Sequence, residues 1–332
     1  MTKVAALADA ILSGNRRALA RAITLIESTR ASDREKAEAL LTSLLPHTGQ
    51  AMRVGISGPP GVGKSTFIEA FGAQVIGEGH RSAVLAVDPS SRRTGGSILG
   101  DKTRMEHLAR DPNAFIRPSP AGTTLGGVAR RTREAMLMVE AAGFGLVLVE
   151  TVGVGQSETA VSEMVDLFVL LVSPGGGDEL QGMKRGVMEL TDLVLVTKAD
   201  GELKSAAARA ASDYAHALHL MRPKYPNLLP QVMQISALER RGITTAWEAV
   251  RECHGALAMS GQLEKLREKQ LRKWFWDETQ AILVEEISGN SILTKKAAVT
   301  ETEVVAGRQL PTAAARSLIR HFRGIQRSSS KS

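Results

Sequence analysis

The chain has 332 residues, of which 43% are apolar and 23% charged, so its composition is that of a globular protein and excludes wholesale disorder. Its 42 Lys and Arg against 35 Asp and Glu give a charge of +7, but residues 304–332 hold six of these bases and no acid. A basic excess confined to one end gives little reason to expect a nucleic-acid or membrane partner. Cys253 is the single cysteine, so there is no internal disulfide, and the longest apolar run, Leu167–Val172, is too short to cross a bilayer. We expect a soluble, cytoplasmic protein.

Residues 1–50 have the apolar spacing of helices, and Pro46 ends the series. Ser32 followed by Glu35 matches a capping box, which predicts Ser32 as the N-cap of a helix. We interpret this region as an N-terminal helical extension.

Residues 51–255 alternate between short apolar runs and helical stretches. Runs of Val, Leu and Ile without polar alternation are typical of parallel strands that are buried on both faces. The sequence therefore predicts an α/β fold with a doubly wound, mostly parallel sheet, and a ligand site at the carboxyl ends of its strands. The predicted strands are Arg53–Ser57, Ala83–Asp88, Ala114–Arg117, Leu146–Glu150, Leu167–Val172, Leu193–Thr197 and Gln231–Ser236.

Residues 256–332 contain no further strand pattern. A long helix is predicted over 261–287, a break at 288–290 and a second helix over 312–322. Trp274, Phe275 and Trp276 place much aromatic bulk on the first of these helices. Such bulk indicates either a subunit interface or packing against the chain's own domain, and we interpret 256–332 as a dimerisation arm.

A phosphate-binding loop is the strongest motif. The residues Gly58-Pro59-Pro60-Gly61-Val62-Gly63-Lys64-Ser65 match G-x-x-x-x-G-K-[ST], follow a predicted strand and precede a helix predicted over Thr66–Gly72. Backbone N–H groups of such a loop bind phosphate oxygens, Lys64 adds charge at the β- and γ-phosphates, and the Ser65 hydroxyl suits Mg²⁺.

Two later segments indicate guanine as the base. Thr197-Lys198-Ala199-Asp200 has the pattern in which the Asp carboxylate accepts from the guanine N1–H and 2-amino groups. Adenine lacks both donors, so it would leave a carboxylate unpaired. Ser236-Ala237-Leu238 follows the next strand and matches a base loop. Together with the P-loop, these segments favour GTP and GDP over ATP.

Three acids are candidates for the magnesium and catalytic site. Glu150-Thr151-Val152-Gly153 lies where P-loop NTPases carry D-x-x-G, so Glu150 is the candidate acid and Gly153 the candidate sensor of the γ-phosphate. Asp88 and Asp101 bound a polar stretch that has the composition of a switch loop. An ordinary strand-ending acid and a solvated loop are the alternatives.

The residue after Gly153 is Val154, where small GTPases carry a Gln that orients the attacking water. We therefore predict slow GTP hydrolysis by the isolated protein, stimulated by a partner or by dimerisation.

The segments GPPGVGKST, VDPSSRRTGGSILGDKTRM, VETVGVGQSE, SPGGGDELQGMKRG and TKAD together resemble the MeaB/ArgK family, P-loop GTPases of the SIMIBI class. The resemblance implies a homodimeric chaperone that binds adenosylcobalamin-dependent methylmalonyl-CoA mutase, gates cofactor loading and protects the mutase from inactivation. It also implies Mg²⁺ near Ser65, Asp88, Asp101 and Glu150, with Lys64 and the three acids catalytic. Gln181 and Lys184 would couple GTP to the mutase. Thr197 departs from the Asn that is more usual in the family.

The sequence leaves three other functions as alternatives. A nickel- or zinc-insertion GTPase would need clustered ligands, and the best pairs here are Cys253-His254 and His216 with His219. A small-molecule kinase shares the P-loop but not the guanine pattern. A nucleic-acid-binding module has only the basic tail and the cluster Arg130, Arg131 and Arg133 in its favour.

Overall fold

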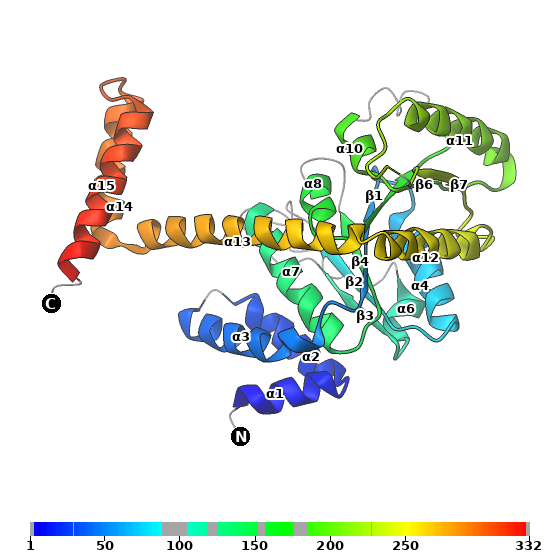
Figure 1. Cartoon of the computed structure of the whole chain (residues 1–332), viewed down its shortest axis with the longest axis horizontal. Helices are drawn as coiled ribbons and strands as arrows, with labels where there is room; N and C mark the ends of the chain where they lie inside the picture. The colour runs from blue at the N-terminus through cyan, green and yellow to red at the C-terminus, as the bar shows by residue number, and fades with distance from the viewer. Residues whose placement is uncertain are drawn as a thin grey trace. The chain divides into compact units, whose positions relative to one another are not determined.

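The structure is a computed structural model that describes residues 3–28, 30–87, 105–118, 125–151, 157–175, 185–226 and 228–329. Over these residues, seven strands form one sheet in the order β3-β2-β4-β1-β5-β6-β7, with every neighbouring pair parallel (Figure 1). The predicted doubly wound α/β fold is confirmed. The strands are β1 (Met52–Ser57), β2 (Ser82–Val87), β3 (Ala114–Arg117), β4 (Leu146–Thr151), β5 (Leu167–Val172), β6 (Leu193–Val196) and β7 (Gln231–Gln234).

Helices cover both faces of the sheet, because alternate residues of each central strand point to opposite sides. In β4, Val147 and Val149 pack with α7 and the N-terminal helices. Leu146 and Leu148 pack with α4 and α12 on the other face. The helices of this α/β region are α4 (Lys64–Gly77), α6 (Glu106–Arg110), α7 (Leu125–Ala141), α8 (Ser157–Ser162), α10 (Arg185–Leu190), α11 (Lys204–His219) and α12 (Ile243–Met259), with a 3₁₀ turn, η2 (Gly201–Leu203).

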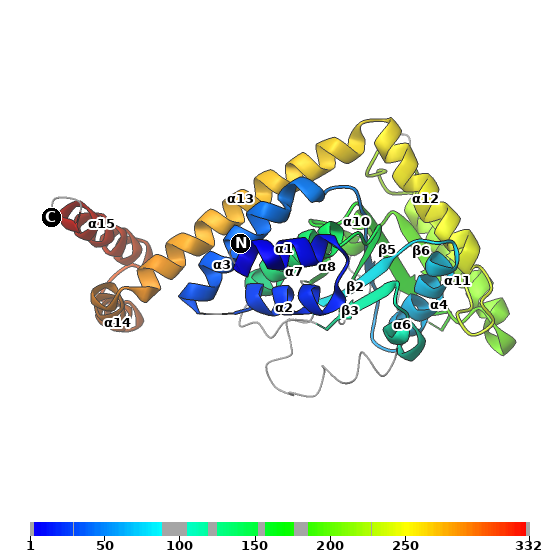
Figure 2. The same cartoon turned by 90° about the horizontal axis from the view of Figure 1, so that it is seen from below.

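The N-terminal extension is helical, as predicted, and its helices lie beside α7 (Figure 2). The predicted N-cap at Ser32 is wrong, because Ser32 lies inside the helix. The third helix begins at Ala31 after Arg30, with no side-chain cap, because the Ser28 hydroxyl binds the Asp33 carboxylate and accepts the Arg30 N–H instead. The elements are α1 (Lys3–Leu12), α2 (Arg16–Ile26), α3 (Ala31–Leu44) and a 3₁₀ turn, η1 (Leu45–His47).

The chain divides into two compact units, residues 1–270 and 271–332. A long helix, α13 (Gln262–Gly289), contributes to both. The break predicted at 288–290 occurs at Asn290 alone, because α13 continues through Gly289, and the Asn290 side chain caps the next helix. In the second unit, α14 (Ser291–Val305) and α15 (Pro311–Ser329) lie side by side (Figure 1). The sequence pattern did not predict α14. The domain boundaries predicted at 50 and 255 remain predictions.

A buried ion pair holds the first turns of α13 at the amino ends of the central strands. Asp166, just before β5, accepts from Arg267 through both carboxylate oxygens, at 2.8 Å and 2.7 Å. It also accepts the Arg53 N–H at 2.9 Å, while Arg267 donates to the carbonyls of Gly49 and Ala51. The pair therefore joins β1, β5 and α13 on the side of the sheet away from the P-loop.

Among the described residues, no helix combines the length and apolarity that a membrane crossing requires.

Candidate functional site

The P-loop connects the carboxyl end of β1 to the first turn of α4. Gly58 has φ 156°, and a Cβ there would lie 2.4 Å from the Leu171 carbonyl oxygen, so β5 leaves no room for a side chain. Pro59, Pro60 and Gly61 follow, and the buried Val62 anchors the loop in the core beneath α4. The loop is thereby fixed by its neighbours.

Lys64 is the first residue of α4, and Gly63 is its N-cap. The Lys64 ammonium group donates to the carbonyl oxygens of Gly58 and Pro59, at 2.7 Å and 3.2 Å, so its side chain folds back over the loop. Ser65 is half-buried and Thr66 exposed in the same turn. N–H groups in the first turn of a helix have no acceptor within it and are suited to an anion.

Glu150 lies at the carboxyl end of β4, level with Ile56 of β1 and Ala86 of β2. Its side chain is in the protein interior, with the residue 5% exposed. The adjacent Thr151 donates from its hydroxyl to that of Ser57, at 2.9 Å, which joins β4 to the last residue before the P-loop. The structure therefore brings Glu150 to the same edge of the sheet as Lys64 and Ser65.

Five predicted site residues lie outside the described residues, and the structure says nothing of them: Asp88, Asp101, Gly153, Gln181 and Lys184.

The segment Thr197–Asp200 follows β6 and is bonded directly to the P-loop. The buried Thr197 hydroxyl lies 2.7 Å from the Val62 carbonyl oxygen and 3.1 Å from that of Val172. Lys198, with φ 53°, donates to the Gly61 carbonyl at 2.8 Å. The segments predicted to bind the phosphates and the base, well separated in sequence, thus lie in direct contact.

The Ser236-Ala237-Leu238 loop lies against the same segment. Ser236 donates from its hydroxyl to Asp200 at 2.5 Å and accepts the Glu239 N–H at 3.1 Å. Leu238 is exposed beside the half-buried Ala237. Arg241 was not among the predicted site residues, yet its guanidinium donates to the Ala199 carbonyl oxygen. The one sequence signal for Arg241 is its position shortly after Ser236-Ala237-Leu238, and this signal does not distinguish Arg241 from the neighbouring Arg240.

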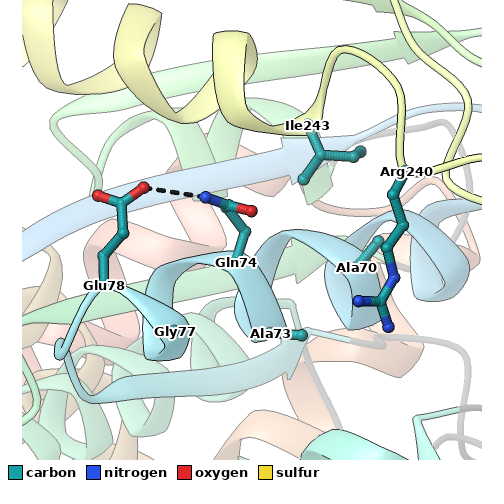
Figure 3. A pocket seen from close by; sticks show the side chains of 7 residues that line it. All are labelled: Ala70, Ala73, Gln74, Gly77, Glu78, Arg240 and Ile243. Carbon is teal, nitrogen blue, oxygen red and sulfur yellow. Dashed lines mark hydrogen bonds between the residues drawn. The ribbon is translucent and has the colours of Figure 1, made fainter.

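A cavity of about 330 Å³ lies between α4 and the residues just after the base loop (Figure 3). Small residues of α4, Ala70, Ala73 and Gly77, line one side, and Arg240 and Ile243 line the other. Figure 3 shows the Arg240 side chain extending toward α4 beside Ala70.

The residue pairs weighed for a nickel or zinc site lie on helices. His216 and His219 are exposed on α11, and Cys253 is buried in α12, where burial and the nearby Asp192 raise its thiol pKa to about 11. Within the described ranges, no three or more His, Cys, Asp and Glu side chains form a group that could hold a metal ion. In the basic cluster of α7, Arg133 is buried and Arg130 lies 3.5 Å from Glu134.

The chain is similar in sequence and in structure to known proteins of one GTPase family. The family described as methylmalonyl-CoA mutase-associated GTPase MeaB matches residues 19–291. A probable GTPase of Mycobacterium bovis is 51% identical over 313 residues, covering 94% of this chain and 93% of the relative. The mitochondrial methylmalonic aciduria type A homolog of Mus musculus is 47% identical and covers 94% of this chain and 78% of its own. The GTPase ArgK of Escherichia coli is 48% identical, with 87% and 88% covered. A crystal structure of an LAO/AO transport system kinase superposes with a TM-score of 0.77 at 37% identity, covering 97% of this chain and 99% of that one.

Proposed function

The chain belongs to the MeaB family of GTPases, and on that premise we propose that it binds GTP and Mg²⁺ and hydrolyses GTP slowly until a partner stimulates it. The partner is adenosylcobalamin-dependent methylmalonyl-CoA mutase, whose cofactor loading it gates and which it protects from inactivation. One observation carries the nucleotide part: the Thr197–Val62 and Lys198–Gly61 hydrogen bonds join the base segment to the P-loop.

In this proposal, different residues at the carboxyl edge of the sheet bind the phosphates and the base. The P-loop backbone from Gly58 to Thr66 and the Lys64 ammonium group bind the phosphates. Asp200 accepts from the guanine edge, while Thr197, Lys198, Ser236, Ala237 and Leu238 surround the base.

The oxygen donors at this edge fit Mg²⁺, a hard cation that binds hydroxyl and carboxylate oxygens. Ser65 supplies such a donor from the first turn of α4 and Glu150 from the carboxyl end of β4, with Asp88 and Asp101 proposed as further ligands. When bound, Mg²⁺ neutralises charge on the β- and γ-phosphates.

Slow hydrolysis follows from Val154, whose side chain can neither orient nor deprotonate a water molecule. A partner that alters the segment after Glu150 would supply what the isolated chain lacks. The names of the family and of the mouse relative support the mutase as this partner. Gln181 and Lys184 are the proposed coupling residues.

An affinity capture tests the proposal. The purified chain, loaded with GDP or a non-hydrolysable GTP analogue, is presented with purified methylmalonyl-CoA mutase. We expect capture that differs between the two nucleotides. Capture that is absent, or equal in both states, would overturn the proposed coupling.

We also propose that residues 256–332 form a homodimer interface. Phe275 and Trp276 of α13 are 63% and 61% exposed, and Trp274 beside them is half-buried. Exposing two large aromatic side chains to water is unfavourable, and contact with a second subunit would bury them.

For this reason, we expect the double substitution Phe275→Asp and Trp276→Asp to convert a dimer to a monomer in sedimentation equilibrium. Leu220→Asp is the matched control, since Leu220 is a 75% exposed apolar residue of the other unit. The control should stay dimeric. A dimer that survives the double substitution would contradict the proposal.

A further inference from the structure

The turn after β7 is closed by two backbone hydrogen bonds. Ser236 and Arg241 each donate an N–H to the carbonyl of the other, both at 3.0 Å. The turn requires left-handed backbone at Arg240, φ 52°, and at Gly242, φ 74°. A Cβ on Gly242 would lie 2.6 Å from the Gln234 carbonyl oxygen, so the chain passes close to β7. The backbone from which the Arg241 side chain extends is therefore well fixed.

This turn holds both polar backbone groups of Ala199. The Ala199 N–H donates to the Ile235 carbonyl at 3.0 Å, and the Ala199 carbonyl accepts from the Arg241 guanidinium. That carbonyl belongs to the peptide plane between Ala199 and Asp200. Arg241 therefore acts on the plane from which the Asp200 side chain projects.

The Asp200 carboxylate is bonded to the same turn by a second route. Its Oδ2 accepts from the Ser236 hydroxyl, which in turn accepts the Glu239 N–H. Glu239 Oε2 also lies 3.5 Å from the Arg241 guanidinium. Two neighbouring donors of guanine can bond one carboxylate only if its plane is correctly placed, because hydrogen bonds weaken steeply with angle.

We propose that Arg241 is a positioning residue for guanine selectivity, which holds the Ala199–Asp200 peptide so that Asp200 meets the guanine N1–H and 2-amino groups together. The inference rests on the proposed function, in which the Asp200 carboxylate accepts hydrogen bonds from guanine. Arg241 itself need not touch the nucleotide.

Arg240 provides a matched control. It is the preceding residue, carries the same charge and is exposed, but it lines the cavity over α4 rather than bonding to Ala199 (Figure 3). Removing either arginine changes the net charge equally, so only a specific role of Arg241 separates the two variants.

The test compares dissociation constants for GDP, IDP and ADP in the wild type and in Arg241→Ala, Arg241→Lys and Arg240→Ala. IDP lacks the 2-amino group, so the ratio of the IDP to the GDP constant reports on the placement of Asp200. We expect Arg241→Ala to reduce this ratio about 10-fold, the loss of roughly one hydrogen bond to a charged group. Arg241→Lys, which keeps a cation but not the planar fork, should give an intermediate ratio. Arg240→Ala should match the wild type.

The outcomes separate the inference from the proposed function. An unchanged ratio in Arg241→Ala, or an equal loss of affinity for all three nucleotides, would overturn the positioning role of Arg241. Neither result would contradict the proposal that the protein selects guanine nucleotides through Asp200. If the wild-type protein bound ADP as tightly as GDP, the proposal that it selects guanine nucleotides would be overturned. If Arg241→Ala does not fold, the ratio measured for Arg241→Lys decides in the same way.

Discussion

Replacing Lys64 with alanine should weaken GTP and GDP binding by about 100-fold, the equivalent of roughly 3 kcal/mol, because a charged donor to the phosphates is lost. The Lys64 side chain spans the P-loop, with its ammonium group on the Gly58 and Pro59 carbonyls. Titration with a fluorescent guanine nucleotide measures the effect directly.

Lys204→Ala is the control for this variant. Lys204 is the first residue of α11, as Lys64 is of α4, and it is exposed. It should leave nucleotide affinity unchanged. If both lysine variants lose affinity equally, or neither does, Lys64 has no specific part in phosphate binding.

Asp166→Asn should lower the free energy of unfolding by about 3–5 kcal/mol, since it leaves the partly buried Arg267 charge without its counterion. The carboxylate of Asp166 also accepts the Arg53 N–H and lies 3.5 Å from His254 Nε2. Urea unfolding measures this as a lower midpoint at unchanged slope. Glu106→Gln, which breaks an exposed 3.7 Å pair with Arg110 in the same unit, should leave the midpoint within error. A midpoint for Asp166→Asn that matches this control would show that the pair does not stabilise the fold.

The same pair predicts a pH dependence. Burial of the Asp166 carboxyl raises its pKa, but the hydrogen bonds and positive charge of Arg267, together with nearby His254 and the Arg53 N–H, outweigh burial and lower the pKa from 3.8 to about 2. Because the folded-state pKa is the lower one, the stabilisation is complete above pH 3.8 and disappears as the pH falls toward 2. It amounts to about 2 kcal/mol. Asp166→Asn should lack this part of the acid-induced loss of stability.

Most of the sheet could be predicted from the sequence because its central strands are buried on both faces. The run Leu167–Val172 contains no polar residue, and β5 has the predicted bounds. Most other strands begin or end one or two residues from their predicted bounds. The P-loop could be recognised because its function requires contiguous residues. The helix Ser291–Val305 was missed because its Thr, Lys and Ala residues give only a weak apolar pattern.

Contacts between distant residues could not be predicted. Arg241 bonds a carbonyl 42 positions away, and Arg267 bonds a carboxylate 101 positions away. Nothing local distinguishes Arg241 from Arg240, or Arg267 from other charged residues of a long polar helix. Their roles depend on which strand ends the fold brings together, and only the three-dimensional arrangement supplies that information.

GTP turnover by the purified chain, measured with and without adenosylcobalamin-dependent methylmalonyl-CoA mutase, tests the proposed function most directly. We predict slow turnover by the chain alone, well below the common enzymatic range of about 1–1,000 s⁻¹, and a severalfold increase when the mutase is added. The Lys64→Ala variant should show neither the slow turnover of the chain alone nor the increase caused by the mutase. A rate that is fast without the mutase, or that does not change when it is added, would contradict the proposal that the mutase is the partner of this GTPase.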